Sequence, residues 1–527
     1  RFVEFDPARR AFTFCQQTFP QMAMGMAEDD QGRIFSVTYP DSGVACFNPA
    51  TRAWRDYGSV YQQNWRQYQR YVAADDAGWL YFGVGNTASQ IVAVEIETGQ
   101  AEPLVPEPER GRGSALVYRD LDGAVYGQVL AGDANPWYRF YRGRAERLAG
   151  ASPRHPVPTI TGHQGLFHQE FPSGRRLVEC DLVERRLVVE DPGTGIRREL
   201  GFDYTSDGAH LMGLAVAPDR TICGGTAFPM RFFCYDPRAD RWTNRASYGQ
   251  WNTVARQGDR FFVGGYGAGF LLEWDPASPW VETEKGATGC NPTFLTECEP
   301  AINRPHCLLA HPDGHILVLA GTPGYGYTGG GLLFWDRRTG DRVLLEHQAI
   351  LPEHSTMSLV ALADGMLLGG TTTGPGTGGE KKAEVAELYL MDLASRRITW
   401  HAPVIPGAQE YTALRARPDG LVYGVVDRRR FIVFDPRARK LVHEEETEPR
   451  FGLTAYQQGP RILVAADNGA VYLLFVRGIA RVEPETFALT WLADSPVPIG
   501  PGGDFLDDRL YFGSESRLYS FAVPRLG

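Results

Sequence analysis

The sequence contains few cysteines and no paired cysteine motif. Its 527 residues include 8 cysteines, and none of them form a Cys-x-x-Cys pair. A structural zinc site is therefore not expected. The positions of the cysteines allow two disulfides. One would join Cys223 and Cys234 about the turn at Phe228-Pro229, and the other would join Cys290 and Cys298. The alternative is that all eight thiols are small buried side chains.

The sequence also lacks long apolar runs and blocks of one charge. No apolar run reaches the roughly 18 residues that indicate a membrane-spanning helix. The formal net charge is -10, and Lys and Arg interleave with Asp and Glu throughout. Neither a nucleic acid nor a membrane is therefore an expected partner. A local basic groove for an acidic ligand is still compatible with this net charge.

No signal peptide is evident, and the chain opens at Arg1 within a strand-like pattern. The compartment stays open: secreted or periplasmic if an upstream segment has been removed, and cytoplasmic otherwise. The composition is globular, with 43% apolar and 12% aromatic residues. The 60 glycines and 36 prolines are spread along the chain. This distribution is typical of many short strands joined by turns.

One phrase recurs along the chain: a strand, then Asp-Pro or a related pair, then a short polar turn and another strand. Asp or Asn caps such a turn through its side chain, and Pro fixes φ. The phrase therefore predicts the hairpin between the two outer strands of a repeat. Its copies are Phe5-Asp6-Pro7, Phe47-Asn48-Pro49, Tyr235-Asp236-Pro237, Trp274-Asp275-Pro276, Trp335-Asp336-Arg337 and Phe434-Asp435-Pro436.

A second phrase precedes each copy. An apolar strand ends in a turn with Asp or Gly, and a strand with Tyr or Phe and small residues follows, as at 214–219, 309–314 and 417–424. Together the phrases predict four strands per unit, with a period of roughly 40–60 residues, which is the signature of propeller blades. The sequence thus predicts an all-β fold, a β-propeller of about eleven four-stranded repeats.

This number of units exceeds the four to eight blades that are usual for one ring. Two propellers, one unusually large ring, or seven to eight blades with insertions would each fit. We favour two sets of blades, residues 1–282 and 306–527, with an irregular crossover or loop at 283–305. Residues 1–15 could close a ring with the C-terminal strands near 509–521.

Polar residues shortly before each turn Asp are the candidate site residues, because the innermost strand of each blade lines the centre of a propeller. The alternative is that these positions are half-exposed and tolerate polar side chains. The candidate catalytic residues are Tyr204, His210, His306, His354 and Tyr411. The candidate substrate-binding residues are Arg66, Tyr68, Arg70, Trp251, Asn252 and Arg304.

Other constellations are weaker. His163 and His168 would point to opposite faces of a strand, so a joint metal site needs a bulge or loop. The glycine-rich stretch 324–331 is best interpreted as a hairpin connection, since no helix is expected after it. We find no Gly-x-Ser-x-Gly motif. No metal site and no cofactor are expected, and a structural ion such as calcium is left open.

This His, Tyr and Arg chemistry suits β-elimination on an acidic glycan. Arg matches a carboxylate bidentately, and His and Tyr can serve as base and acid. With its repeat pattern, the chain resembles the β-propeller polysaccharide lyases such as the ulvan lyases, and more loosely the streptogramin lyases. The resemblance implies that His and Tyr act as base and acid while Arg neutralises the uronate, and it draws attention to Tyr204, His210 and Arg220.

Three functions are therefore weighed. The first is a lyase that cleaves acidic, uronate-containing oligo- or polysaccharides by β-elimination. The second is a glycoside hydrolase at one end of a propeller channel. The third is a non-catalytic propeller that binds a glycan or a protein.

Overall fold

The structure is a computed structural model of the whole chain. It describes residues 1–6, 9–18, 22–120, 122–130, 135–150, 173–181, 184–203 and 208–524. Two compact units make up the chain. Unit 1 comprises Arg1–Thr205 and Thr377–Glu380, and unit 2 comprises Ser206–Gly376 and Lys381–Gly527.

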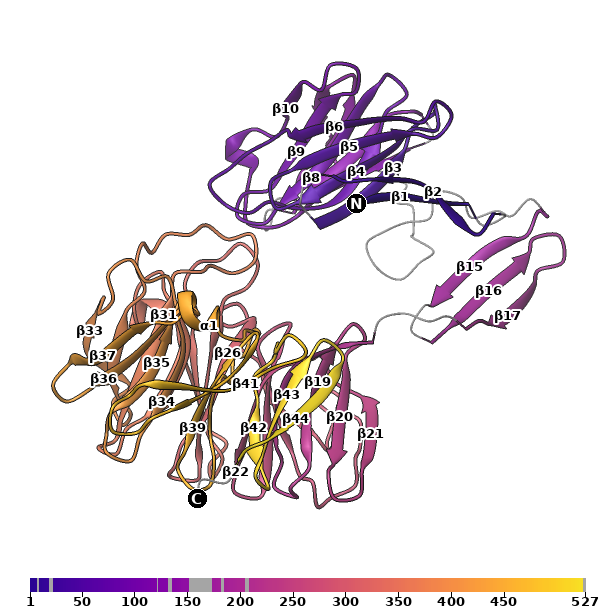
Figure 1. The fold of residues 1–527 in the computed structure, drawn as a ribbon. Helices are drawn as coiled ribbons and strands as arrows, with labels where there is room; N and C mark the ends of the chain where they lie inside the picture. Colours follow the sequence, from indigo (N-terminus) through magenta and orange to yellow (C-terminus); the bar gives the residue numbers. More distant parts are fainter. Residues whose placement is uncertain are drawn as a thin grey trace. The chain divides into compact units, whose positions relative to one another are not determined.

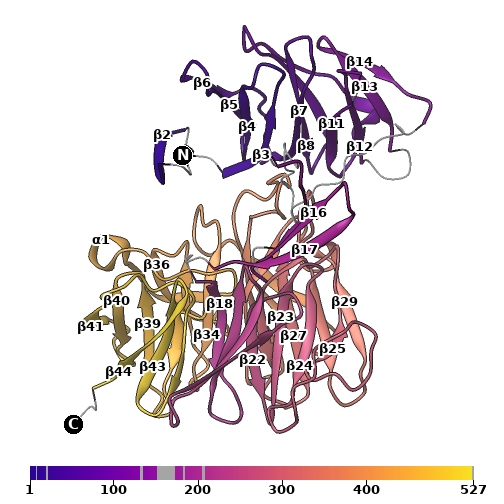
Figure 2. The same cartoon turned by 90° about the vertical axis from the view of Figure 1, so that its right-hand side faces the viewer.

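Unit 1 contains three consecutive four-stranded antiparallel sheets, a two-stranded sheet and a three-stranded sheet among its described residues. Figure 2 shows the sheets β3–β6, β7–β10 and β11–β14 following one another. The strands are β1 (Phe2–Asp6), β2 (Ala11–Gln16), β3 (Met22–Glu28), β4 (Ile34–Tyr39), β5 (Gly43–Asn48), β6 (Ala53–Ser59), β7 (Tyr68–Ala74), β8 (Trp79–Gly85), β9 (Gln90–Glu95), β10 (Ala101–Pro103), β11 (Ala115–Arg119), β12 (Val125–Val129), β13 (Trp137–Tyr141), β14 (Arg144–Arg147), β15 (Arg176–Asp181), β16 (Arg186–Asp191) and β17 (Ile196–Gly201).

Unit 2 contains six four-stranded sheets and a final three-stranded sheet over residues 208–524. The strands are β18 (His210–Val216), β19 (Ile222–Ala227), β20 (Arg231–Asp236), β21 (Arg241–Ala246), β22 (Gln250–Gln257), β23 (Arg260–Tyr266), β24 (Phe270–Trp274), β25 (Thr293–Thr296), β26 (Arg304–Ala310), β27 (Ile316–Thr322), β28 (Leu332–Asp336), β29 (Arg342–Leu345), β30 (Ser355–Ala361), β31 (Met366–Thr372), β32 (Leu388–Asp392), β33 (Arg397–Ala402), β34 (Tyr411–Ala416), β35 (Val422–Val426), β36 (Arg430–Asp435), β37 (Lys440–Glu446), β38 (Leu463–Ala465), β39 (Val471–Phe475), β40 (Gly478–Val482), β41 (Leu489–Asp494), β42 (Asp504–Leu506), β43 (Arg509–Ser514) and β44 (Arg517–Ala522).

Helical structure is slight. The described residues contain one short α-helix, α1 (Glu448–Phe451), and two 3-10 helices at Glu107–Glu109 and His347–Ala349. In the described part of the chain, none of these helices has the length and apolar character needed to cross a membrane. The fold is therefore all-β, as the sequence predicts.

The seven sheets of unit 2 form a closed ring. The first strand of each sheet contacts the first strand of the next, and the last sheet, β42–β44, contacts β18 of the first. In Figure 1 the yellow strands β42–β44 lie beside the magenta strands of that first sheet. Leu211 N donates to Glu515 O at 2.7 Å, and Val216 N donates to Asp504 Oδ2 at 3.0 Å. A ring of four-stranded sheets is a β-propeller, so unit 2 is a propeller of seven blades.

The turn chemistry that predicted the repeat is present. In the turn between β20 and β21, Asp236 Oδ1 accepts from Arg238 N at 3.0 Å, and in the turn between β36 and β37, Asp435 Oδ1 accepts from Arg437 N at 2.9 Å. These are the third and fourth strands of their sheets, as the phrase predicts. The second phrase marks the turn between the first and second strands, where Asp419 Oδ1 accepts from Leu421 N at 3.1 Å.

The hydrophobic core of the ring is divided among the junctions between sheets. One cluster packs Phe232 of the first sheet against Trp251, Phe261 and Leu272 of the second. Similar clusters join later sheets in pairs. Because each sheet buries both faces against its neighbours, the strands are apolar along most of their length.

The observed boundaries differ from those expected. The division between units falls near residue 205, whereas segment 283–305 lies within unit 2. There β25 is the fourth strand of the β22–β25 sheet, reached from β24 through a long connection, and this connection makes the sequence irregular. Strands β1 and β2 form their own sheet in unit 1, so the ring of unit 2 is closed by β42–β44 instead of residues 1–15.

Candidate functional site

Several innermost strands of unit 2 share a break in register near their first residues. The break leaves one extra residue in each strand: Met212 in β18, Asn252 in β22, His306 in β26, Met357 in β30 and Thr412 in β34. Three of these residues, Asn252, His306 and Thr412, are polar and buried. A β-bulge of this kind re-aims a side chain, and bulges are frequent beside functional sites. Two of these polar side chains, Asn252 and His306, contact Gln458.

A short stretch of chain leaves its own sheet and crosses the ring. Ala455 N donates to Leu474 O and Leu474 N donates to Ile462 O, so the backbone runs beside β39 before and after residues 456–461. Those six residues, here called the crossing segment, do not pair with β39. The innermost strand of this sheet, β38, is accordingly only three residues long.

The crossing segment contacts the first three sheets of the ring. Gln457 Nε2 donates to Leu211 O in β18 at 3.4 Å. Asn252 Nδ2 in β22 donates to Gln458 Oε1 at 2.7 Å, and the ring nitrogen Nδ1 of His306 in β26 hydrogen-bonds to Gln458 O. Side chains from two bulges therefore hold one glutamine at the centre of the ring.

Arg304, near the crossing segment, has a guanidinium nitrogen without a hydrogen-bond partner. Its guanidinium carbon lies 5.0 Å from the ring centre of Tyr266. Among the described residues it forms no side-chain hydrogen bond and no ion pair, and its Nε is buried without a partner. A guanidinium that lacks an acceptor is poised to bind an anion, because arginine offers five donors in a planar fork.

Tyr456 stands at the same end of the ring, at the start of the crossing segment. The guanidinium carbon of Arg428 lies 5.0 Å from its ring centre. Burial, followed by the charge of Glu410, raises the pKa of the Tyr456 hydroxyl to about 12, although 37% of the residue's surface is exposed. This phenol is protonated at neutral pH.

Glu410 supplies a carboxyl group near Tyr456. Burial raises its pKa, and Thr412 Oγ1 donates to its Oε1 at 2.8 Å. The turn between β35 and β36 holds this region in place. Asp427 Oδ1 accepts from Glu410 N at 2.8 Å, and Arg428 Nη2 donates to Thr454 O at 2.8 Å. We call Tyr266, Arg304, Glu410, Arg428 and Tyr456 the Arg304 cluster.

The predicted catalytic residue His306 lies beside this cluster but is enclosed. It is 7% exposed, and its Nε2 lies 3.1 Å from Thr322 Oγ1. Burial lowers its pKa to about 4. A neutral ring with its proton on Nδ1 can donate to Gln458 O and accept from Thr322, so both nitrogens are occupied.

Tyr411, Trp251 and Asn252 are also enclosed, each with 0% of its surface exposed. The Tyr411 hydroxyl accepts from Ile405 N at 3.3 Å, and burial raises its pKa. Trp251 Nε1 donates to Tyr248 O at 3.3 Å. These three side chains are buried within the ring.

The remaining predicted catalytic residues are dispersed. His354 precedes β30, with Nδ1 at 2.8 Å from Pro352 O and Nε2 at 2.9 Å from Val385 O. His210 is exposed at the start of β18. Tyr204 lies outside the described residues, as do His163 and His168.

Arg66, Tyr68 and Arg70 belong to unit 1, not to the ring that contains Arg304. The guanidinium carbon of Arg70 lies 4.7 Å from the ring centre of Tyr68, which also packs against Tyr39. Of the predicted substrate-binding residues, only Arg304 and Asn252 lie close to the crossing segment.

Tyr266, Arg428 and Tyr456 were missed by reasoning from sequence. That reasoning considered only residues that enter innermost strands. Tyr266 ends the second strand of its sheet, and Arg428 lies in a turn between second and third strands. Because antiparallel strands alternate in direction, these positions lie at the same end of the ring as the start of the first strand. A search that included those turns would have found Tyr266 and Arg428.

All eight cysteines are free thiols. Cys223 and Cys234 are direct partners across β19 and β20, as their positions about the turn predict. Burial raises the pKa of the Cys223 thiol. Cys290 and Cys298 are unpaired as well, and Cys298 is buried.

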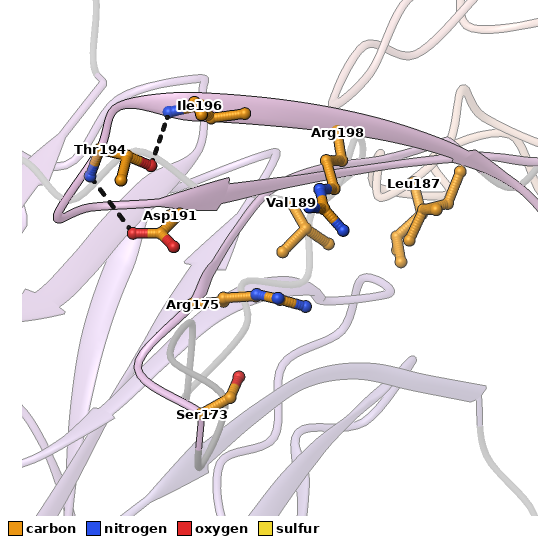
Figure 3. Close-up of a pocket in the computed structure, with 9 residues that line it drawn as sticks. Ser173, Arg175, Leu187, Val189, Asp191, Thr194, Ile196 and Arg198 are labelled. Carbon is orange, nitrogen blue, oxygen red and sulfur yellow. Dashed lines mark hydrogen bonds between the residues drawn. The ribbon is translucent and has the colours of Figure 1, made fainter.

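A hollow of about 620 Å³ lies against the three-stranded sheet of unit 1 (Figure 3). Arg175, Asp191 and Arg198 line it, and Thr194 N donates to Asp191 Oδ1 at 3.3 Å. None of the predicted site residues lines this hollow. Within the ranges that the structure describes, no three His, Cys, Asp or Glu side chains are grouped so as to hold a metal ion.

No protein-family model and no curated protein matches the sequence. Solved structures do match. The β-propeller domain of Cps50 (Swd1) from Myceliophteria thermophila is 14% identical with a TM-score of 0.44, covering 61% of this chain and 99% of that one. The extracellular domain of BT4673 from B. thetaiotaomicron, a candidate one-component system, is 12% identical with a TM-score of 0.36, covering 95% of this chain and 75% of that one. The closed ring of sheets is what identifies unit 2 of this chain as a β-propeller.

Proposed function

We propose that the propeller of unit 2 binds a carboxylate-bearing glycan at the Arg304 cluster. The proposal rests on the guanidinium of Arg304. Its Nε is buried without an acceptor, and it forms no ion pair in the described chain. A carboxylate would supply two acceptor oxygens in the geometry that arginine matches best.

The neighbours of Arg304 suit a sugar. Tyr266 and Tyr456 present aromatic faces, and Tyr456 is partly exposed. Aromatic rings offer a flat apolar surface with a polar hydroxyl, which suits a ligand that has both apolar and hydroxylated faces. Glu410 can accept hydrogen bonds from ligand hydroxyl groups when it is ionised.

The test compares two ligands of the same length. An oligouronate and its carboxyl-reduced, neutral analogue are titrated into the whole protein at low and at moderate salt. We expect the oligouronate to bind at least about tenfold more tightly, with an advantage that shrinks as salt rises. Equal binding of the two ligands, or binding of neither, would contradict the proposal.

A second candidate is β-elimination at the same cluster, with Glu410 in place of the histidine that the resemblance to polysaccharide lyases implies as the base. Tyr456 is protonated and stands within electrostatic reach of Arg304 and Glu410. In this reaction Glu410 takes the proton beside the uronate carboxylate while Arg304 stabilises the resulting charge. The bond to the leaving oxygen breaks, Tyr456 protonates that oxygen, and a carbon–carbon double bond forms.

The three functions differ in their products. A lyase generates an unsaturated uronate that absorbs in the ultraviolet, and Tyr456→Phe should abolish it while ligand binding is retained. New reducing ends without that absorbance would indicate a glycoside hydrolase. Binding without any new chain end would leave the propeller as a glycan-binding protein and would exclude both reactions for the polymers tried.

A further inference from the structure

A second cationic centre lies deeper in the ring than Arg304. Arg461, the last residue of the crossing segment, donates from Nη1 to Val254 O at 2.9 Å and from Nη2 to Asp504 Oδ2 at 3.2 Å. Its Nε is buried and has no partner. Arg415, in β34, donates from Nη1 to Leu463 O at 3.3 Å.

The crossing segment separates this centre from the Arg304 cluster. In β22, Asn252 contacts Gln458, and Val254 two residues farther along contacts Arg461. In β26, Arg304 precedes His306, which contacts Gln458. The order along the ring axis is therefore Arg304, then Gln458, then Arg461. Arg304 and Arg461 therefore lie on opposite sides of Gln458.

The charges at this second centre do not balance. Arg461 Nη2 lies 3.2 Å from one carboxylate, Asp504, which also accepts from Val216 N at 3.0 Å. Arg415 Nη1 donates to Leu463 O, two residues after Arg461, and the charges of both Arg461 and Asp504 act on Arg415. Arg415 forms no ion pair in the part of the chain that the structure describes. Burial, and then the charge of Arg461, lowers the pKa of Arg415. Two positive groups held together with one counter-charge are unfavourable unless an anion joins them.

We infer that Arg415 and Arg461 form a binding site for a small tetrahedral oxyanion, phosphate or sulfate, inside the propeller. Guanidinium groups bind such anions through paired N–H donors, and Arg461 Nε is a donor without an acceptor. The crossing segment closes the site on the side toward Arg304, so the site accepts only a small ion. The anion bridges β34 and the crossing segment, and so stabilises the centre of the ring.

The experiment titrates inorganic phosphate into the whole protein at constant ionic strength, with calorimetry and thermal unfolding as readouts. We expect saturable binding and a rise in melting temperature. Arg415→Gln should weaken phosphate binding at least about tenfold, and Arg415→Lys should fall between it and the unchanged protein. Arg437→Gln, which removes an exposed charge in the β36–β37 turn, is the matched control and should bind normally.

Arg304→Gln separates the two sites. It should leave phosphate binding unchanged, because Arg304 lies on the other side of the crossing segment. The inference is overturned if the unchanged protein shows no saturable response to phosphate or sulfate, or if Arg415→Gln and Arg415→Lys bind as well as Arg437→Gln. It is also overturned if Arg304→Gln removes the response. If no oligouronate binds, the proposed glycan site fails, but the phosphate titration still tests the oxyanion site.

Discussion

The side-chain amide of Asn252 donates to Gln458 Oε1 at 2.7 Å, across 206 residues of sequence. Asn252 occupies a bulge in the innermost strand of the second sheet, and Gln458 lies in the segment that leaves the sixth. This contact ties two distant sheets together at the centre of the ring. It also places the crossing segment between Arg304 and Arg461.

A substitution at Gly459 tests how closely the crossing segment packs on β22. A Cβ at this position would lie 2.4 Å from Asn252 O and 3.0 Å from the Thr253 side chain. Gly459→Ala should therefore force the segment away and lower the free energy of unfolding by about 1–3 kcal/mol. Denaturant unfolding measures this. Gly201→Ala, where nothing lies within 4 Å of the added Cβ, is the control and should change stability by less than about 1 kcal/mol.

His306 predicts a dependence of stability on pH. Its pKa is lowered from 6.5 to about 4 by burial, so the unfolded chain binds a proton at a pH where the folded one does not. The free energy of unfolding that depends on neutral His306 is on the order of 3 kcal/mol. It is fully present above pH 6.5 and is lost as the pH falls toward 4. We expect the melting temperature to fall across this window.

The variant His306→Gln removes the titrating group and keeps a hydrogen-bonding side chain. The unchanged protein should lose more stability between pH 6.5 and 4 than this variant does, because other groups titrate equally in both. Parallel pH profiles for the two proteins would show that His306 is not held neutral by burial.

Asp504 joins the last sheet of the ring to the first. Its Oδ2 accepts from Val216 N and from Arg461 Nη2. Asp504→Ala leaves both donors without this acceptor and should cost about 2–4 kcal/mol of stability. Asp259→Ala removes an exposed partner of Arg260 and should cost about 1 kcal/mol or less. Equal losses would argue against closure of the ring through Asp504.

The cysteines should differ in reactivity. Cys15 is exposed, whereas Cys223 has 0% of its surface exposed and its pKa is raised by burial. Under native conditions an alkylating reagent should modify Cys15 first and Cys223 last, because the thiolate is the reactive form. Mass spectrometry of the labelled peptides measures the order. Early modification of Cys223 would contradict its placement between sheets.

The fold was predictable from the sequence because its signals are local. Asp236 and Asp435 bond to backbone amides two residues on, so each hairpin is encoded within a few residues. Ring closure depends on contacts such as Leu211 with Glu515, which no local pattern indicates. The long connection before β25 looked like a crossover because sequence does not show that Thr293–Thr296 returns to pair with β24.

The residues of the candidate site follow from the sequence only in part. Position at the start of an innermost strand identified Arg304, and also Asn252 and His306 beside it. The same rule selected Trp251 and Tyr411, whose side chains are buried between sheets, because neighbouring residues of a strand face opposite ways. Tyr456 belongs to a segment that departs from the repeat, so a rule based on the repeat does not reach it.

The most direct test of the account is the affinity of an oligouronate for Arg304→Gln, measured by calorimetry beside the unchanged protein and Arg437→Gln. The account predicts that Arg304→Gln binds at least about tenfold more weakly, while Arg437→Gln, which loses the same charge from the exposed β36–β37 turn, binds normally. Equal affinity of Arg304→Gln and the unchanged protein would contradict the account, since no other arginine of the cluster lacks an acceptor.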